Sequence, residues 1–146
     1  MKAAALAAVL AAAPLAGCIS VSETRGLTCP AGQDRHLVAE LAFGRNIGQT
    51  LGVSEADFAR FLDEVVSPRF PDGYSVVDGQ GRWLYKGVVY NEPNKHLNLI
   101  LPGRPDDQRK LAEIAAAYED RFRQDAVLSM IAPACISFWY PKDRAR

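Results

Sequence analysis

The sequence lacks the charge pattern of a nucleic-acid-binding protein. Its 146 residues include 17 Lys and Arg and 17 Asp and Glu, with no long run of either sign. Because binding to a phosphate backbone needs a basic stripe or patch, we expect no nucleic-acid partner. The balance of charge also gives no polybasic route to anionic lipid.

Motifs of several enzyme classes are missing as well. The chain has no G-x-S-x-G nucleophile elbow, no phosphate-binding glycine loop and no dinucleotide fingerprint. It has only 2 histidines, and no acidic cluster has calcium-loop spacing, so we expect neither a metal nor a cofactor. Its 3 cysteines include no C-x-x-C pair, which argues against thiol catalysis.

The first 17 residues differ in kind from the rest. Lys2 precedes an apolar run over 3–14, which is too short to span a bilayer as a helix but suits a signal peptide. The run ends in Leu15-Ala16-Gly17-Cys18, which resembles a bacterial lipoprotein signal. The resemblance implies removal of residues 1–17 and acylation of Cys18, so that the lipid bilayer is the partner and the chain faces the periplasm. An ordinary secretory signal with an incidental Cys18 is the alternative.

The residue after Cys18 bears on the choice of membrane. It is Ile19, where an aspartate would resemble an inner-membrane retention signal. The absence of an aspartate at position 19 favours the outer membrane. Residues 18–35 lack periodicity, which predicts a lipidated tether, and 141–146 form a polar tail.

Export would place the other two cysteines in an oxidising compartment. Cys29 and Cys135 form an even pair, and closing so long a loop would contribute on the order of 4–5 kcal/mol to stability. Two unpaired thiols remain the alternative, because the sequence does not show whether the Cβ atoms meet.

Residue periodicity predicts a single α+β domain over 36–140. The predicted strands are 36–43, 74–77, 95–101 and 127–140, the last broken by a bulge at Pro133. Helices are predicted from an N-cap at Ser54 to Ser67, and from Asp106 to Gln124. A turn at 78–81 and a hairpin extension over 83–90 separate the second and third strands.

The resulting β-α-β-β-α-β order is that of a ferredoxin-like split βαβ fold. Such a fold has a four-stranded antiparallel sheet with two helices on one face. The fourth strand lies beside the first, followed by the third and the second. The other face of the sheet is left open.

Short motifs between His36 and Phe138 indicate a family. They are Glu40-Leu41, Phe43-Gly44-Arg45, Val65-Val66, Pro68-Arg69-Phe70-Pro71-Asp72-Gly73, Glu92-Pro93, Lys95, Tyr118 and Arg121-Phe122. They resemble those of a bacterial family of small exported proteins known only as a domain of unknown function, although Ala42 stands where an aromatic or large apolar residue is expected. The resemblance implies no activity.

The open face of the sheet is the candidate site. With the first and third strands antiparallel neighbours, Glu40 would lie near Asn98 and diagonally near His96. A carboxylate beside an imidazole can act as an acid–base pair. Just past the first strand, Arg45 could hold an anionic group.

Two further cations, Arg69 and Lys95, could assist at such a site. A solvated polar face is the alternative, with Glu40 paired to Arg45 or Lys95. The aromatic hairpin could contact a partner or cover its own sheet edge; its aromatic residues are Trp83, Tyr85 and Tyr90.

Two functional hypotheses follow. The preferred one is a non-catalytic binding or interaction module, with a second copy of the chain or an envelope protein as its partner. The other is a small cofactor-free enzyme or small-molecule-binding protein that uses Glu40 and Arg45 on the open face.

Overall fold

Four long strands and two helices make up most of the chain. The computed structural model describes residues 26–140, so the signal peptide, Cys18 and the polar tail of the sequence analysis lie outside the described residues. The elements are β1 (Asp34–Gly44), β2 (Asn46–Ile47), β3 (Thr50–Leu51), α1 (Glu55–Phe61), the π-helical turn η1 (Leu62–Val66), β4 (Ser75–Tyr85), β5 (Val88–Leu101), α2 (Asp107–Phe122) and β6 (Leu128–Ile136).

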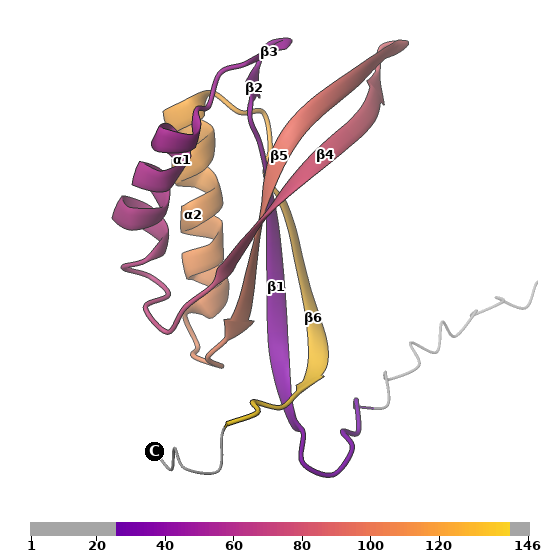
Figure 1. The fold of residues 1–146 in the computed structure, drawn as a ribbon, viewed down its shortest axis with the longest axis vertical. Helices are drawn as coiled ribbons and strands as arrows, with labels where there is room; N and C mark the ends of the chain where they lie inside the picture. The colour runs from indigo at the N-terminus through magenta and orange to yellow at the C-terminus, as the bar shows by residue number, and fades with distance from the viewer. Residues whose placement is uncertain (1–25, 141–146) are drawn as a thin grey trace, which may run out of the picture.

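The long strands form one antiparallel sheet in the order β4-β5-β1-β6. This is the order expected for the four predicted strands. The two helices lie on the same side of the sheet, and no helix of residues 26–140 lies on the other side (Figure 1). An α+β domain with a four-stranded antiparallel sheet and two helices is therefore confirmed.

An aromatic cluster lies between the sheet and the helices. Phe43 of β1 is fully buried, and its ring centroid is 4.6 Å from that of Tyr118 and 5.8 Å from that of Phe61. Alternate residues of β5, among them Leu97 and Leu99, are buried on the same face. Since burying each large apolar side chain contributes roughly 1.5–3 kcal/mol, this cluster anchors the helices to one face of the sheet.

The first helix begins and ends where its sequence predicts. The Ser54 hydroxyl accepts a hydrogen bond from the Asp57 amide at 3.1 Å, and the Asp57 carboxylate accepts one from the Ser54 amide at 3.3 Å. This reciprocal capping box fixes the start of α1. The helix continues into η1, and Pro68 prevents its extension beyond Ser67.

Strand β4 is longer than predicted, and the prediction of a turn at 78–81 was wrong. Gly79 and Gly81 lie inside β4, opposite Asn94 and Glu92 of β5. The pairing continues past Pro93 because β1 ends opposite Asn94, so one side of β5 has no neighbouring strand there. The predicted hairpin extension is thus the outer half of one long β4–β5 hairpin.

Strand β6 also differs from its prediction. Its register with β1 runs without interruption through Pro133, which lies opposite Leu37, so the predicted bulge was wrong. Proline is tolerated here because β6 is an edge strand, whose outer side makes no ladder hydrogen bonds. The strand ends at Ile136, before the aromatic residues at 138–140.

A disulfide ties the segment before β1 to the end of β6. Cys29 and Cys135 are bonded, with their Cα atoms 5.4 Å apart. Strand β1 begins at Asp34, two residues earlier than predicted, and pairs Arg35 with Cys135. Between residues 26 and 140, no helix has the length and apolarity that a membrane crossing needs.

Candidate functional site

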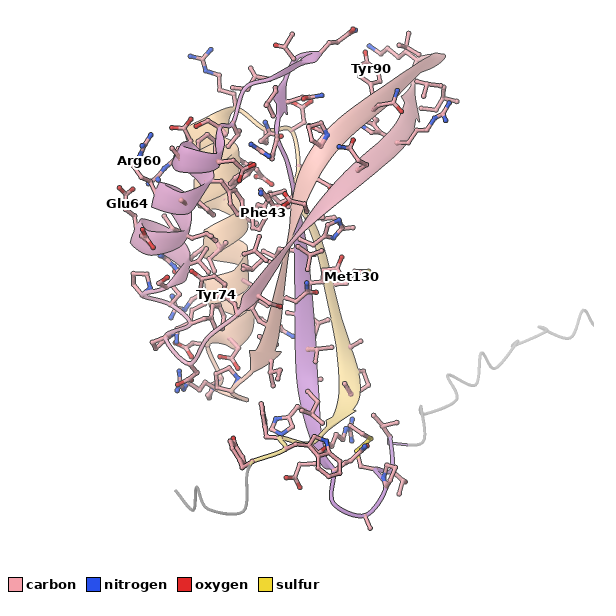
Figure 2. All side chains as sticks on the ribbon, viewed as in Figure 1. Phe43, Arg60, Glu64, Tyr74, Tyr90 and Met130 are labelled. Atoms are coloured by element: carbon pink, nitrogen blue, oxygen red, sulfur yellow. A yellow bond between two sulfur atoms is a disulfide. The ribbon has the colours of Figure 1, made fainter. Side chains whose placement is uncertain are left out.

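The open face of the sheet is hollowed by a cavity of about 910 Å³. Val38, Ile100 and Ala132 lie on this face because they occupy one cross-strand row of β1, β5 and β6. Met130 extends from β6 on the side away from the helices (Figure 2), and Phe138 completes the apolar part of the wall. Such a volume and lining suit a small-molecule site.

Polar side chains converge on the same cavity. Glu40 lies opposite Asn98 of β5, as predicted, and Ser75 of β4 continues that row. His36 and Asp72 also line the cavity. Of the described lining residues none is a Lys or Arg, so the fixed charges on the wall are carboxylates.

A hydrogen bond joins Glu40 to His96. Glu40 Oε1 lies 2.7 Å from His96 Nδ1, and about a third of each side chain is exposed. Only Glu40 lines the cavity, so His96 lies beside the wall and orients the carboxylate. The predicted diagonal neighbours are therefore in contact.

A glycine that the sequence analysis missed makes room for this pair. A Cβ at Gly79 would lie 2.7 Å from His96 Nε2 and 2.2 Å from Asn94 Oδ1. The imidazole therefore lies over a position of β4 that only glycine leaves vacant. A glycine within a strand often marks such close approach, but the expected turn at 78–81 concealed that pattern.

Arg45 does not belong to this site. Its Nε and Nη2 donate to the Val53 carbonyl at 3.0 and 2.8 Å, and its Nη1 donates to Glu55 at 2.6 Å. The side chain is buried next to the start of α1, on the helix-covered side of the sheet. The prediction that Arg45 shares the open face with Glu40 was wrong, because the guanidinium instead holds the Val53 carbonyl and Glu55 at the start of α1.

Lys95 was also wrongly assigned to the site. It lies on the buried face of β5, opposite Phe43, and its Nζ contacts Asp78 at 2.5 Å and Glu55 at 2.7 Å. The hydrogen bonds to Asp78 and then Glu55 raise the pKa of Lys95. Its hydrogen bond in turn lowers the pKa of each carboxyl group. Neither Arg45 nor Lys95 pairs with Glu40.

Arg69 links two parts of the helical layer. Its Nε donates to Glu113 of α2 at 3.1 Å, and its Nη1 donates to the Val65 carbonyl at 2.8 Å. Its predicted assisting role was therefore wrong.

In the aromatic hairpin, Trp83 stacks on Tyr90 with ring centroids 4.8 Å apart.

The structure thus brings together a carboxylate, an imidazole and an amide beside an apolar hollow. The apolar wall was not predicted from the sequence, although the alternation of Met130 and Ala132 in β6 indicates it. Across 26–140, no three His, Cys, Asp or Glu side chains group closely enough to hold a metal ion.

The fold and site define an α+β domain with one helix-covered face and one hollowed face. Residues 38–138 match the family described as protein of unknown function (DUF3574), and the chain belongs to that family. This confirms the resemblance to a domain of unknown function. No curated protein matches the chain.

Solved structures share the fold. The chain is similar to a phage SAM lyase in its apo state, with TM-score 0.54 and 18% identity over 79% of this chain and 98% of that one. The phage SAM lyase in complex with S-methyl-5'-thioadenosine gives TM-score 0.53 and 18% identity, over 80% and 98% of the two chains. CutA from Synechococcus elongatus gives TM-score 0.48 and 9% identity, over 70% and 80%. At these identities the likeness concerns the fold alone.

Proposed function

We propose that the chain is a lipoprotein of the bacterial cell envelope, whose domain binds a small molecule on the open face of its sheet. The single observation that carries the binding role is the cavity of about 910 Å³ with the Glu40 carboxylate, oriented by His96, in its wall. A pre-formed apolar hollow with few, positioned polar groups is what small-molecule sites have in common.

The anchor is the acylated Cys18, which holds the domain on a bilayer and facing the periplasm, with the outer membrane favoured. The signal-like sequence before Cys18 supports this part of the proposal. The bridge between Cys29 and Cys135 supports it too, since disulfides persist in oxidising compartments. We further propose that the domain is of the ferredoxin-like type.

The wall of the cavity favours a ligand with an apolar body and a cationic or hydrogen-bond-donating group. Glu40 brings a carboxylate to the wall, whereas Asp72 pairs with Arg104 at 3.1 Å. Val38, Ile100 and Met130 offer apolar contact. The hydrogen bond to His96 uses Oε1 of Glu40, and Oε2 would meet the ligand. An ammonium or sulfonium group would gain a charge-assisted contact there.

A second candidate is a small cofactor-free enzyme at the same site. The observation that favours it is the distance of 2.7 Å between Glu40 Oε1 and His96 Nδ1, because a carboxylate hydrogen-bonded to an imidazole is an acid–base pair. We place it second because this pair lies at one side of a mostly apolar wall.

A thermal-shift screen of the mature chain tests the binding role. The panel contains primary alkylamines, S-adenosylmethionine and S-methyl-5'-thioadenosine, the last two chosen because solved relatives of this fold act on or hold them. A ligand present at about a hundred times its Kd adds about 2.7 kcal/mol to the free energy of unfolding, which raises Tm by several degrees.

The variants decide where a ligand binds. Glu40→Gln should abolish the rise in Tm, whereas Glu64→Gln should keep it. Glu64 lies on the helical layer (Figure 2), where it pairs with Arg121. A rise that survives Glu40→Gln would contradict the site. If no compound in the panel raises Tm, the small-molecule role fails, and crosslinking would then test for a second copy or an envelope protein on this face. Product formation by chromatography would favour the enzyme over the binding module.

A further inference from the structure

Three consecutive aromatic residues follow β6 and are exposed. Phe138 is 58% exposed, Trp139 93% and Tyr140 54%. The rings of Phe138 and Tyr140 stack with centroids 6.2 Å apart. Trp and Tyr combine an apolar ring with a polar atom, and they concentrate at the boundary between lipid and water.

These aromatics lie at the end of the molecule that the N-terminal tether enters. The bridge between Cys29 and Cys135 fastens the tether three residues before Phe138. Figure 1 shows that the segment before β1 and the end of β6 lie together, at the opposite end of the molecule from the tip of the β4–β5 hairpin. An anchor in the N-terminal segment would therefore draw this aromatic end toward the bilayer.

The bridge also limits how far the domain can move from the membrane. Cys18 stands 11 residues before Cys29 in the sequence, a span of about 40 Å at full extension. Without the bridge the tether would run on to Asp34, where β1 begins. The bridged chain thus keeps the aromatic segment within reach of the headgroups.

Charge at the end of the sequence points to the same partner. After Tyr140 come Pro141-Lys142-Asp143-Arg144-Ala145-Arg146, with three cations and one anion. Lys and Arg side chains are attracted to anionic lipid headgroups. The even balance of the whole chain conceals this local excess.

We propose that the segment 138–140 docks into the headgroup region of the bilayer that holds the Cys18 anchor. The inference rests on the proposed lipid anchor. Because Phe138 also lines the open-face cavity, docking places that cavity beside the membrane surface.

Tryptophan fluorescence of the lipidated mature chain tests this docking, because the sequence has only 2 tryptophans. The variant Trp83→Phe retains Trp139, and the matched variant Trp139→Phe retains Trp83 on the distal hairpin. Each is reconstituted in vesicles of phosphatidylethanolamine and phosphatidylglycerol, with and without lipid brominated near the headgroups. Trp139 emission should move to shorter wavelength and lose intensity with the brominated lipid, whereas Trp83 emission should do neither.

The outcomes separate this inference from the anchor. Intact mass and vesicle flotation report acylation first, and a chain without acyl mass that does not float overturns both proposals. An acylated, floating chain whose Trp139 emission is unaffected by brominated lipid overturns the docking alone. A shift to shorter wavelength without quenching also overturns it, because Trp139 would then be covered by protein, such as a second copy of the chain.

Discussion

A hydrogen bond between two side chains on neighbouring strands determines the chemistry of the open face. Glu40 and His96 meet because β1 and β5 pair in a register that makes them diagonal neighbours. The imidazole has room only because β4 carries glycine at position 79. Three strands therefore contribute to one side-chain contact.

The variant Gly79→Ala should break this contact. The backbone φ of Gly79 is not in the left-handed region, so alanine at this position causes no backbone strain. Its added Cβ would, however, lie 2.7 Å from His96 Nε2 and displace the imidazole ring. We expect the imidazole resonances of His96 to move and to lose their dependence on Glu40, as seen by NMR in Gly79→Ala with and without Glu40→Gln.

Gly81→Ala is the matched control for that prediction. A Cβ there would come no closer than 3.2 Å to Asn94 Nδ2 and would not reach His96. Alanine loses less conformational entropy on folding than glycine does, so the free energy of unfolding of this variant should be unchanged or higher by up to about 1 kcal/mol. Identical His96 resonances in the two variants would refute the role of Gly79.

The side-chain alternation of β1 places Arg45 as well as Glu40. The period of two assigned Glu40 to the open face. Continued past Gly44, the same period places Arg45 on the covered face with Leu41 and Phe43, where it is buried and binds the Val53 carbonyl. Arg45 was assigned to the open face because the strand was predicted to end before it and the alternation was not extended to it.

At the scale of elements, an ionic cluster joins α1 to the base of the β4–β5 hairpin. Glu55 of α1 and Asp78 of β4 both contact Lys95 of β5, and Glu55 also accepts from Arg45. The two cations are buried, while the two carboxylates are largely exposed. Buried cations need such partners. The cluster therefore holds α1 against the β4–β5 hairpin.

This cluster predicts how stability depends on pH. The pKa values of Glu55 and Asp78 are lowered from 4.5 and 3.8. The stability that these two carboxylates contribute is therefore fully present above their ordinary pKa values, and it is lost as the pH falls through their lowered pKa values in the folded chain. The pKa of Lys95 is raised from 10.5, so its contribution is present below that value and is lost as pH rises through the raised one. The free energy of unfolding should fall on the acid side below about pH 4.5.

Urea unfolding at a series of pH values measures that dependence. Glu55→Gln should be less stable than the parent at neutral pH and should lose less stability in acid, because glutamine does not titrate. Asp125→Asn is the control, since Asp125 is exposed and makes no ion pair with any other residue in the range 26–140. The same acid dependence in Glu55→Gln and in the parent would argue against the cluster.

At the scale of the whole molecule, the disulfide joins residues separated by 106 positions. It closes nearly the entire domain into one loop, because Cys29 precedes β1 and Cys135 lies in the last strand. The cross-link restricts the unfolded chain, and in the chain-entropy model its effect grows with loop length.

Replacing both cysteines should therefore lower the free energy of unfolding by on the order of 4–5 kcal/mol. The variant Cys29→Ser with Cys135→Ser, compared with the parent by urea unfolding without reductant, gives this difference. Alkylation and intact mass of the parent show whether the bridge is complete in the sample. A loss below about 1 kcal/mol with a complete bridge would mean that the bridge does not restrict the unfolded state as this model requires.

The sequence by itself determined the elements whose information is local. Alternating apolar residues located β1 and the inner half of β5, and Ser54 with Asp57 located the start of α1. These assignments succeeded because side-chain period and capping depend on neighbours within a few positions. Even the contact of Glu40 with His96 was predictable once two strands were known to be neighbours.

The tertiary structure alone decided the rest, since it depends on residues far apart in the chain. Pairing with β5 extends β4 through Gly79 and Gly81, where local propensity predicts a turn. The helical layer covers Arg45 and Lys95 and supplies Glu55 as their partner, and residues of all four long strands line the cavity. Long-range packing outweighs local preference at these places because each residue gains more from its distant partners than from its own backbone conformation.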